Sequence, residues 1–280
     1  MNRILACIDA SSYATSVVEL AAWAAARLSA EVELLHVVQR KDAVASRNDH
    51  SGAIGLGVKS ELLEELTRIE EAAGRLAIEE GRILLDAGGA RLKQQDVSFT
   101  PRHLHGGIVE TIVDREGDAA LVIIGKRGAS AGFATDHIGS KVERVVRASD
   151  KPVLIASREV RAPSAVVIAF DNSRAACRAV RHVATSPLFS DMPVKLVMAG
   201  PDNAEHRDQL SAAAALLPAG AETILQDGTV DAVIRDAMVA HSGAMLVMGA
   251  YGHSPLRTLI VGSTTTSMIR TVHAPVLLVR

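Results

Sequence analysis

Aromatic side chains are scarce in this sequence of 280 residues, where they make up 2%. Proteins that bind single-stranded nucleic acid stack the bases on such side chains, so that class of function is not expected. An excess of basic residues is also missing, because 30 Lys and Arg stand against 32 Asp and Glu. Since a net charge of −2 offers no broad cationic surface, we expect no nucleic-acid partner.

Long apolar runs and closely spaced cysteines are lacking too. No run approaches the roughly 18 residues of a membrane-spanning helix, so no membrane partner is expected. The first residues, MNRILACIDA, do not resemble a signal peptide, which favours a cytoplasmic location. Cys7 and Cys177 fit neither a metal nor a redox spacing and are interpreted as small core residues.

An internal repeat organises the chain. Residues 3–11, RILACIDAS, are similar to residues 165–173, AVVIAFDNS, and Ala-rich stretches follow at 14–28 and 174–184. A short apolar run that ends in a turn residue predicts a buried strand, and the Ala-rich stretches predict helices.

A second pair of similar segments lies later in each half. Residues 120–125, ALVIIG, match 244–249, AMLVMG, and Pro-led apolar runs follow at 151–156 and 274–279. Proline suits the start of a strand but not its middle, so these runs are expected to be edge or terminal strands. We predict that the two terminal strands pair with each other and join the halves as a pseudo-dimer, with further homodimerisation left open.

The two repeats differ in length. Asp9 lies 116 positions before Gly125, whereas Asp171 lies 78 positions before Gly249. Most of the additional residues form a predicted loop, 39–58, and a charged amphipathic helix, 59–85. This helix is interpreted as a solvated crossover with one buried face, with a partner-binding surface as the alternative.

The alternation of strands and helices predicts an α/β protein of two doubly wound domains, each with a five-stranded parallel sheet flanked by helices. The polar segment 157–164 is the predicted linker, which gives domains at 1–157 and 163–280.

Ligands of such sheets bind beyond the carboxyl ends of the strands, where Asp9, Asp171 and two glycine-rich turns are expected. A glycine turn lets a phosphate approach the backbone, and the following helix presents free N–H groups. Hydroxyls gather at one such helix start, Gly262 to Ser267, and Lys141 follows Gly139 and Ser140 at the other. Neither turn matches a Walker A motif or the Gly-x-Gly-x-x-Gly fingerprint.

Gly249-x2-Gly252-x9-Gly262-Ser263 resembles the nucleotide loop of the universal stress protein family, and the resemblance extends over both halves. It implies a tandem protein that binds ATP or ADP, with Mg²⁺ accompanying the phosphates. The loop would hold phosphate and ribose, the acidic residue would lie near the adenosine, and the second strand would contact adenine through its backbone. The positions implied in the second half are Asp171, Val197, Met198, Gly249, Gly252, His253, Gly262, Ser263 and Thr264.

The first half departs from this pattern. Ten residues, rather than nine, separate Gly128 from Gly139, and Asp136 lies between them. Lys126 and Arg127 are expected to offset that carboxylate. The corresponding candidates are Asp9, Gly125, Gly128, Gly139 and Ser140, and we expect the second half to bind ATP more tightly.

Neither a catalytic constellation nor a metal site is predicted. His103 and His105 would share one face of a strand, but a third ligand is not near in sequence, and His36 is interpreted as a core residue. The leading hypothesis is a nucleotide-sensing regulator with an unknown signalling partner, and the family resemblance implies that it acts in the stress response. The alternatives are a slow ATPase or self-phosphorylating enzyme that uses Ser263, and a ligand-free scaffold.

Overall fold

The computed structural model describes residues 3–39, 56–128, 140–159, 162–250 and 263–280. Both halves show the predicted alternation of strands and helices. The first half consists of β1 (Arg3–Cys7), α1 (Ala14–Leu28), β2 (Glu31–Val38), α2 (Leu56–Gln94), β3 (Phe99–His105), α3 (Ile108–Arg115), β4 (Ala119–Gly125), α4 (Ser140–Ala148) and β5 (Val153–Ala156). The second half consists of β6 (Ala165–Ala169), α5 (Arg174–Thr185), a 3-10 turn (Pro187–Phe189), β7 (Val194–Ala199), α6 (Ala204–Ala214), β8 (Glu222–Gln226), α7 (Val230–Ala240), β9 (Ala244–Gly249), α8 (Ser263–Thr271) and β10 (Val276–Val279).

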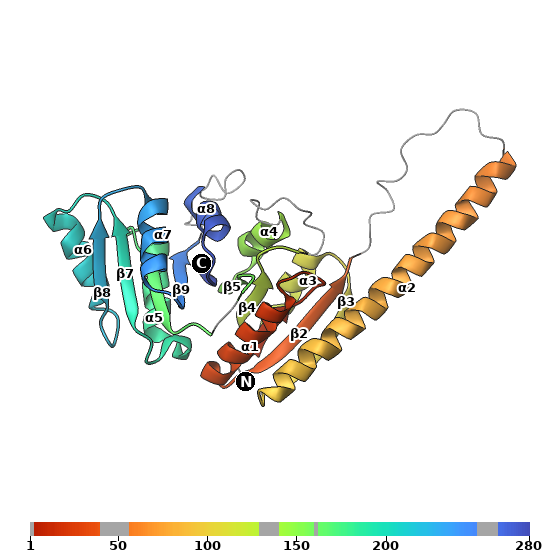
Figure 1. Cartoon of the computed structure of the whole chain (residues 1–280), viewed down its shortest axis with the longest axis horizontal. Coiled ribbons are helices and arrows are strands. Elements are labelled where there is room, and N and C mark those ends of the chain that lie inside the picture. The colour runs from red at the N-terminus through yellow and green to blue at the C-terminus, as the bar shows by residue number, and fades with distance from the viewer. Residues whose placement is uncertain (1–2, 40–55, 129–139, 160–161, 251–262) are drawn as a thin grey trace.

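All ten strands lie in one sheet, in the order β3-β2-β1-β4-β5-β10-β9-β6-β7-β8 (Figure 1). Strands are parallel within each half, whereas β5 and β10 pair antiparallel, with Val276 opposite Ile155 and Leu278 opposite Val153. The two terminal strands therefore join the halves, as the sequence predicts.

The Pro-led strands are the terminal strand of each half, as expected, and their pairing with each other places them at the centre of the ten-stranded sheet. Pro152 and Pro275 lie just before β5 and β10, where their missing N–H groups are not needed by the ladder. Their carbonyl groups still take part, since they accept from the N–H groups of Val122 and Leu246. Proline within a strand occurs in β3, at Pro101, and β3 is an edge strand as expected for that residue.

Helices cover both faces of the sheet. One buried cluster brings together α1, α2, α5 and α6, and a second cluster unites α3, α4, α7 and α8. Alternate residues of each strand supply the two clusters, so that Ile4 belongs to the first and Leu5 to the second. Burial on both faces explains why the strands read as continuous apolar runs in the sequence.

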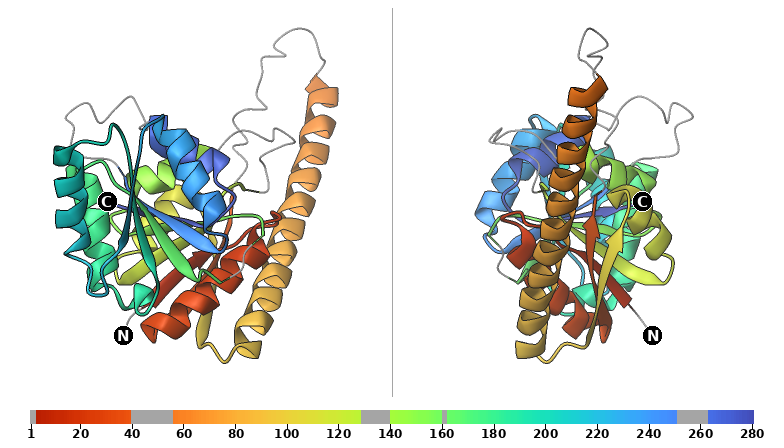
Figure 2. Two further views of the ribbon diagram at one scale, coloured as in Figure 1. Left: turned by 60° about the vertical axis from the view of Figure 1, so that its left-hand side comes forward. Right: turned by 90° about the vertical axis from the view of Figure 1, so that its right-hand side faces the viewer.

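Helix α2 is longer than the sequence predicts and ends at Gln94 rather than near residue 85. Its last turns pass Gly88 and Gly89, which normally weaken a helix. A Cβ at Gly88 would lie 2.9 Å from Leu34 Cδ2, and one at Gly89 would lie 2.6 Å from Phe99 Cε2. These glycines therefore allow the helix to approach the sheet closely, while the other end of α2 projects beyond it (Figures 1 and 2). Among the described helices, none is both long and apolar enough to cross a membrane.

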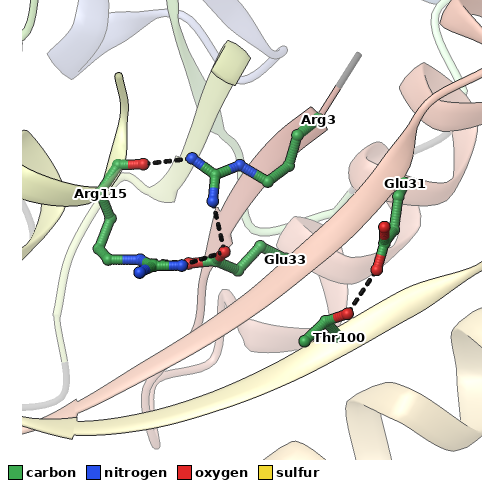
Figure 3. Close-up of polar contacts among 5 residues, drawn as sticks. All are labelled: Arg3, Glu31, Glu33, Thr100 and Arg115. Atoms are coloured by element: carbon green, nitrogen blue, oxygen red, sulfur yellow. Dashed lines mark hydrogen bonds and ion pairs between the residues drawn. The ribbon is translucent and has the colours of Figure 1, made fainter. Parts of the chain in front are cut away.

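A buried carboxylate on β2 links this strand to β1 and to the end of α3. Glu33 on β2 accepts from both Arg3 and Arg115, with the Arg115 guanidinium binding its two oxygens at 2.8 and 2.6 Å (Figure 3). Burial alone would raise the pKa of Glu33, but the hydrogen bonds and charges of Arg115 and Arg3 outweigh burial and lower it. Glu33 therefore stays ionised and ties β1, β2 and the end of α3 together.

Candidate functional site

A cavity of about 90 Å³ lies at the carboxyl ends of β1 and β4. These two strands are neighbours, while the chain continues from β1 toward β2 on one side and from β4 toward β5 on the other. The cavity therefore occupies the point where strand order reverses, the usual ligand position in such sheets. Its walls are formed by Cys7, Ile8, Asp9, Val37, Gln39, Ile108, Ile112, Ile124, Gly125, Arg127, Gly128, Lys141, Val142 and Val145.

Asp9 supplies the carboxylate of this cavity. Its Oδ1 accepts a hydrogen bond from the backbone N–H of Ser11 at 3.1 Å, which orients the side chain in the turn after β1. Gly128 lies against the other oxygen, because a Cβ built there would be 3.1 Å from Asp9 Oδ2. The structure thus brings together two predicted positions, Asp9 and Gly128, that are far apart in sequence.

Two cationic side chains reach the same cavity. Arg127 comes from the turn after β4, and Lys141 comes from the first turn of α4. Lys141 Nζ donates to Gln39 Oε1 at 2.5 Å, which connects the start of α4 to the end of β2. Two cations beside the positive end of a helix dipole favour a bound anion.

The remaining walls are apolar. Ile108 and Ile112 project from one face of α3, and Val142 and Val145 come from α4. Cys7 also contributes, and burial, followed by the charges of Glu33 and Asp9, strongly raises the pKa of its thiol. Cys7 is therefore a protonated, apolar wall residue rather than a nucleophile. The sequence reasoning missed Gln39 and the two isoleucines, although an apolar pair four residues apart on a short helix could have indicated a wall.

Lys126 does not take the role that the sequence suggested. It is buried, and its Nζ donates to the carbonyl oxygens of Arg270 at 2.8 Å and Val272 at 3.2 Å, at the carboxyl end of α8. Burial, with a smaller effect of Arg127, lowers the pKa of Lys126 to about 8. The expectation that Lys126 balances a loop carboxylate is wrong, because its ammonium group satisfies helix carbonyls of the other half.

In the second half, Asp171 lies just beyond β6 and is exposed. Its Oδ1 accepts from the N–H of Ser173 at 2.9 Å, and Ser173 in turn caps α5. Gly249 serves close packing, since a Cβ there would lie 2.2 Å from the backbone carbon of Ala175. Gly125 is similar, because its Cβ would lie 2.7 Å from Cβ of Tyr13. Both glycines thus have a packing reason that is independent of any ligand.

Comparison with known proteins identifies the fold. The family model described as Universal stress protein family matches residues 1–157 and 164–280. The chain belongs to this family. Universal stress protein Slr1230 of Synechocystis sp. is 32% identical over 288 residues, covering 100% of both chains.

Solved structures agree in fold. A universal stress protein from Archaeoglobus fulgidus has a TM-score of 0.70 at 20% identity, covering 100% of this chain and 98% of that one. A protein of Pseudomonas aeruginosa, described as functionally unknown, has a TM-score of 0.63 at 14% identity, with 100% and 92% covered. The chain is thus a tandem of two universal stress protein units in one sheet.

The positions implied for adenine lie inside the sheet of the second universal stress protein unit. The side chains of Val197 and Met198 are buried on opposite faces, and β7 continues to Ala199. The carbonyl of Val197 accepts from the N–H of Phe170 at 2.8 Å.

Several predicted positions of this universal stress protein cannot be compared with the structure. Gly139, Gly252, His253 and Gly262 lie outside the described residues. The backbone of Ser140 begins α4 and that of Ser263 begins α8, followed by the half-buried Thr264. Their contribution to a site therefore stays a prediction.

Three histidines cluster near one edge of the first unit. The rings of His103 and His105 stack at 6.2 Å, which confirms that they share a face, and the buried His36 lies 5.1 Å from His103. Within the described part of the chain, no group of three or more His, Cys, Asp or Glu side chains is arranged to hold a metal ion. His36 and His103 instead face Gly81 of α2, as the close contacts there show.

Proposed function

We propose that this universal stress protein is a regulatory binding module for an adenine nucleotide, ATP or ADP with Mg²⁺. The observation that carries the proposal is the cavity where Asp9, Arg127 and Lys141 meet, at the point in the first half where the strand order reverses. The resemblance of the second loop to a nucleotide loop extends the proposal to the second half.

The chemistry of the cavity walls suits the parts of a nucleotide. A carboxylate such as Asp9 accepts hydrogen bonds from ribose hydroxyls, as acidic residues do in dinucleotide-binding sites. Arg127 and Lys141 complement phosphate charge, and the apolar side chains of α3 provide a surface for a purine ring. Mg²⁺ is held mainly by phosphate oxygens and water, so we propose that it is bound with the phosphates and takes few ligands from the protein.

The described cavity accounts for only part of such a ligand. Its volume of about 90 Å³ is below the roughly 300 Å³ at the lower end of ligand pockets. The predicted phosphate loops, 129–139 and 251–262, lie outside the described residues. The expectation that the second half binds more tightly therefore rests on sequence, because its loop has no acidic residue and matches the nine-residue spacing.

Calorimetric titration of ATP and ADP in the presence of Mg²⁺ tests this function. We expect two binding steps in the wild type, of which Gly252→Val removes the tighter and Gly128→Val the weaker. The double variant should bind neither nucleotide, because a side chain would occupy the phosphate position in both loops. Lys141→Met should weaken the step that Gly128→Val removes and leave the other unchanged.

Two results would contradict the proposal. If the wild type gives no heat with either nucleotide, or if the double variant binds as well as the wild type, the loops do not form nucleotide sites. If Gly128→Val abolishes binding while Gly252→Val leaves it unchanged, the ranking of the two halves is wrong. Chromatography of the nucleotide after incubation shows whether ATP is returned intact, as expected of a sensor, or converted to ADP.

A further inference from the structure

Within the described part of the chain, no packing contact explains the apolar side chains in the projecting half of α2. From residue 64 to residue 80 every side chain is exposed except that of Ala77, which is half-buried. The same helix packs on α1, β2 and β3 only farther along, where Leu85 and Leu92 are buried (Figures 1 and 2). A helix with no packed face gains little stability in water, so this segment is expected to find a partner.

The exposed apolar residues of this segment follow a heptad. Leu66, Ile69, Ala73 and Leu76 alternate spacings of three and four residues, the a and d positions of a coiled coil. Large fractions of three of these side chains are exposed: 43% of Leu66, 56% of Ile69 and 70% of Leu76. We call these four residues the α2 seam. Apolar residues that repeat on average every 3.5 positions are typical of a helix that packs against a second helix, rather than against a flat surface.

The α2 seam is not a continuation of the face that packs on the sheet. Gly81, Leu85 and Leu92 point toward the protein core. At about 100° per residue, the centre of the seam lies roughly 120° around the helix from the centre of those residues. The protein's own sheet therefore cannot cover the seam, even if the helix were pressed more closely against it.

The charges beside the α2 seam decide what kind of helix fits. Residues 64–80 contain six glutamates and two arginines, a net charge of −4. Both arginines already pair within the helix, Arg68 with Glu65 and Arg75 with Glu71. Glu65 and Glu70 occupy the g and e positions that flank the seam. A second copy of α2 would bring two such acidic segments together, whereas a helix with Lys or Arg at e and g would complement them.

We propose that the α2 seam is the docking site for a cationic amphipathic helix of another protein, which pairs with α2 as a two-helix coiled coil. The partner helix has apolar residues at a and d and basic residues at e and g. Because the seam is separate from the cavity at β1 and β4, docking and ligand binding occupy different surfaces of the first half.

The test uses the full chain and a synthetic helical peptide of about three heptads, with Leu at a and d and Lys at e and g. Fluorescence anisotropy should show saturable binding that weakens as salt is added, because screening reduces the charge attraction. The same peptide with Glu at e and g should bind at least tenfold more weakly. Leu76→Ser should weaken binding of the Lys peptide at least tenfold.

A matched control uses the same substitution on another face. Ile78 is 45% exposed but lies away from the seam, so Ile78→Ser should bind the Lys peptide like the wild type. The double variant Glu65→Lys and Glu70→Lys should prefer the Glu peptide instead. Circular dichroism verifies that each variant keeps its fold, which is expected because these side chains lie outside the packed core.

Three results would overturn the proposal. The first is no binding of the Lys peptide to the wild type, and the second is equal weakening by Ile78→Ser and Leu76→Ser. The third is a wild-type dimer in sedimentation that Leu76→Ser dissociates, since the seam would then bind a second copy despite its charge.

Discussion

Two glycines of α2 give opposite predictions for the same substitution. Gly81→Ala is expected to destabilise the protein, whereas Gly74→Ala is expected to stabilise the helix. Replacing glycine by alanine inside a helix normally gains up to about 1 kcal/mol, because alanine loses less backbone freedom on folding. Only the surroundings of the new Cβ therefore distinguish the two variants.

The surroundings of Gly81 leave no room for a methyl group. A Cβ there would lie 2.4 Å from His103 Nε2 and 2.5 Å from His36 Nδ1, far inside van der Waals contact. The ring of His36 is buried between α2 and the sheet, so it has little freedom to move. Overpacking of this kind costs about 1–3 kcal/mol, and the helix-propensity gain offsets part of it. We therefore expect a net loss of up to about 2 kcal/mol in the free energy of unfolding.

Gly74 offers open space to a new methyl group, because no heavy atom lies within 4 Å of the position that its Cβ would take. Only the propensity gain therefore applies there. Urea unfolding followed by circular dichroism measures the first effect as a lower midpoint for Gly81→Ala. The stabilisation of the helix by Gly74→Ala should appear as slower hydrogen exchange of the α2 backbone amides than in the wild type. If Gly81→Ala raised the unfolding midpoint, the close packing of α2 on the histidine pair would be refuted.

Three further predictions concern buried ionisable groups. Glu33→Gln leaves the half-buried Arg3 and Arg115 without their carboxylate and should lower the free energy of unfolding in urea by about 1–3 kcal/mol, whereas an unchanged midpoint would refute the network. Because the pKa of Glu33 is lowered in the folded state, its contribution to stability is complete above the pKa of the unfolded chain and is lost as the pH falls through the lower, folded-state pKa. Glu33→Gln should therefore remove this decrease of the free energy of unfolding at acid pH. Burial, together with the nearby His103, lowers the pKa of His36, while the charge of Asp9 acts in the opposite direction. The protein should therefore lose stability as the pH falls from about 6.5, the pKa in the unfolded chain, to the lower pKa of the folded state. The dependence of the free energy of unfolding on pH in this range should be weaker in His36→Leu. Lys126→Met leaves two helix carbonyls without a donor and should lower the free energy of unfolding by about 1.5–3 kcal/mol, and an unchanged midpoint in thermal unfolding would contradict this.

Local sequence patterns predict much of the fold. The bounds of α1, Ala14–Leu28, are those that its Ala-rich stretch predicts, and α5 is one residue longer than predicted. The end of α2 was not predictable in this way, because Gly88 and Gly89 indicate a helix end by propensity alone. Only the closeness of the sheet, which is a tertiary property, explains why glycine is favourable there.

The candidate site was predictable where a motif marks it and not where packing makes it. Asp9 and Gly128 were expected near the ends of β1 and β4, and parallel strands do bring them together. Gln39 and Ile108 come from other elements and have no motif of their own, so only the folded chain shows that they face the same cavity. Lys126 shows the opposite case, because its place in a glycine-rich turn suggested that it offsets a loop carboxylate, whereas its ammonium group donates to carbonyls at the end of α8.

The contact between the halves shows how a repeated fold departs from a repeated sequence. The carboxyl end of α8 is capped by Lys126, which follows β4 of the other half. The carboxyl end of α4 is capped by Arg280, whose guanidinium donates to the carbonyls of Arg147 at 3.0 Å and Ser149 at 2.8 Å. The residue that corresponds to Lys126 in the second half is Ala250, so the two caps come from non-equivalent positions. Both helix ends present their last carbonyls toward the other half, and in each case a different cationic side chain donates to them. Comparing the repeats therefore locates the strands and turns, while the residues that join the halves have to be found in the structure.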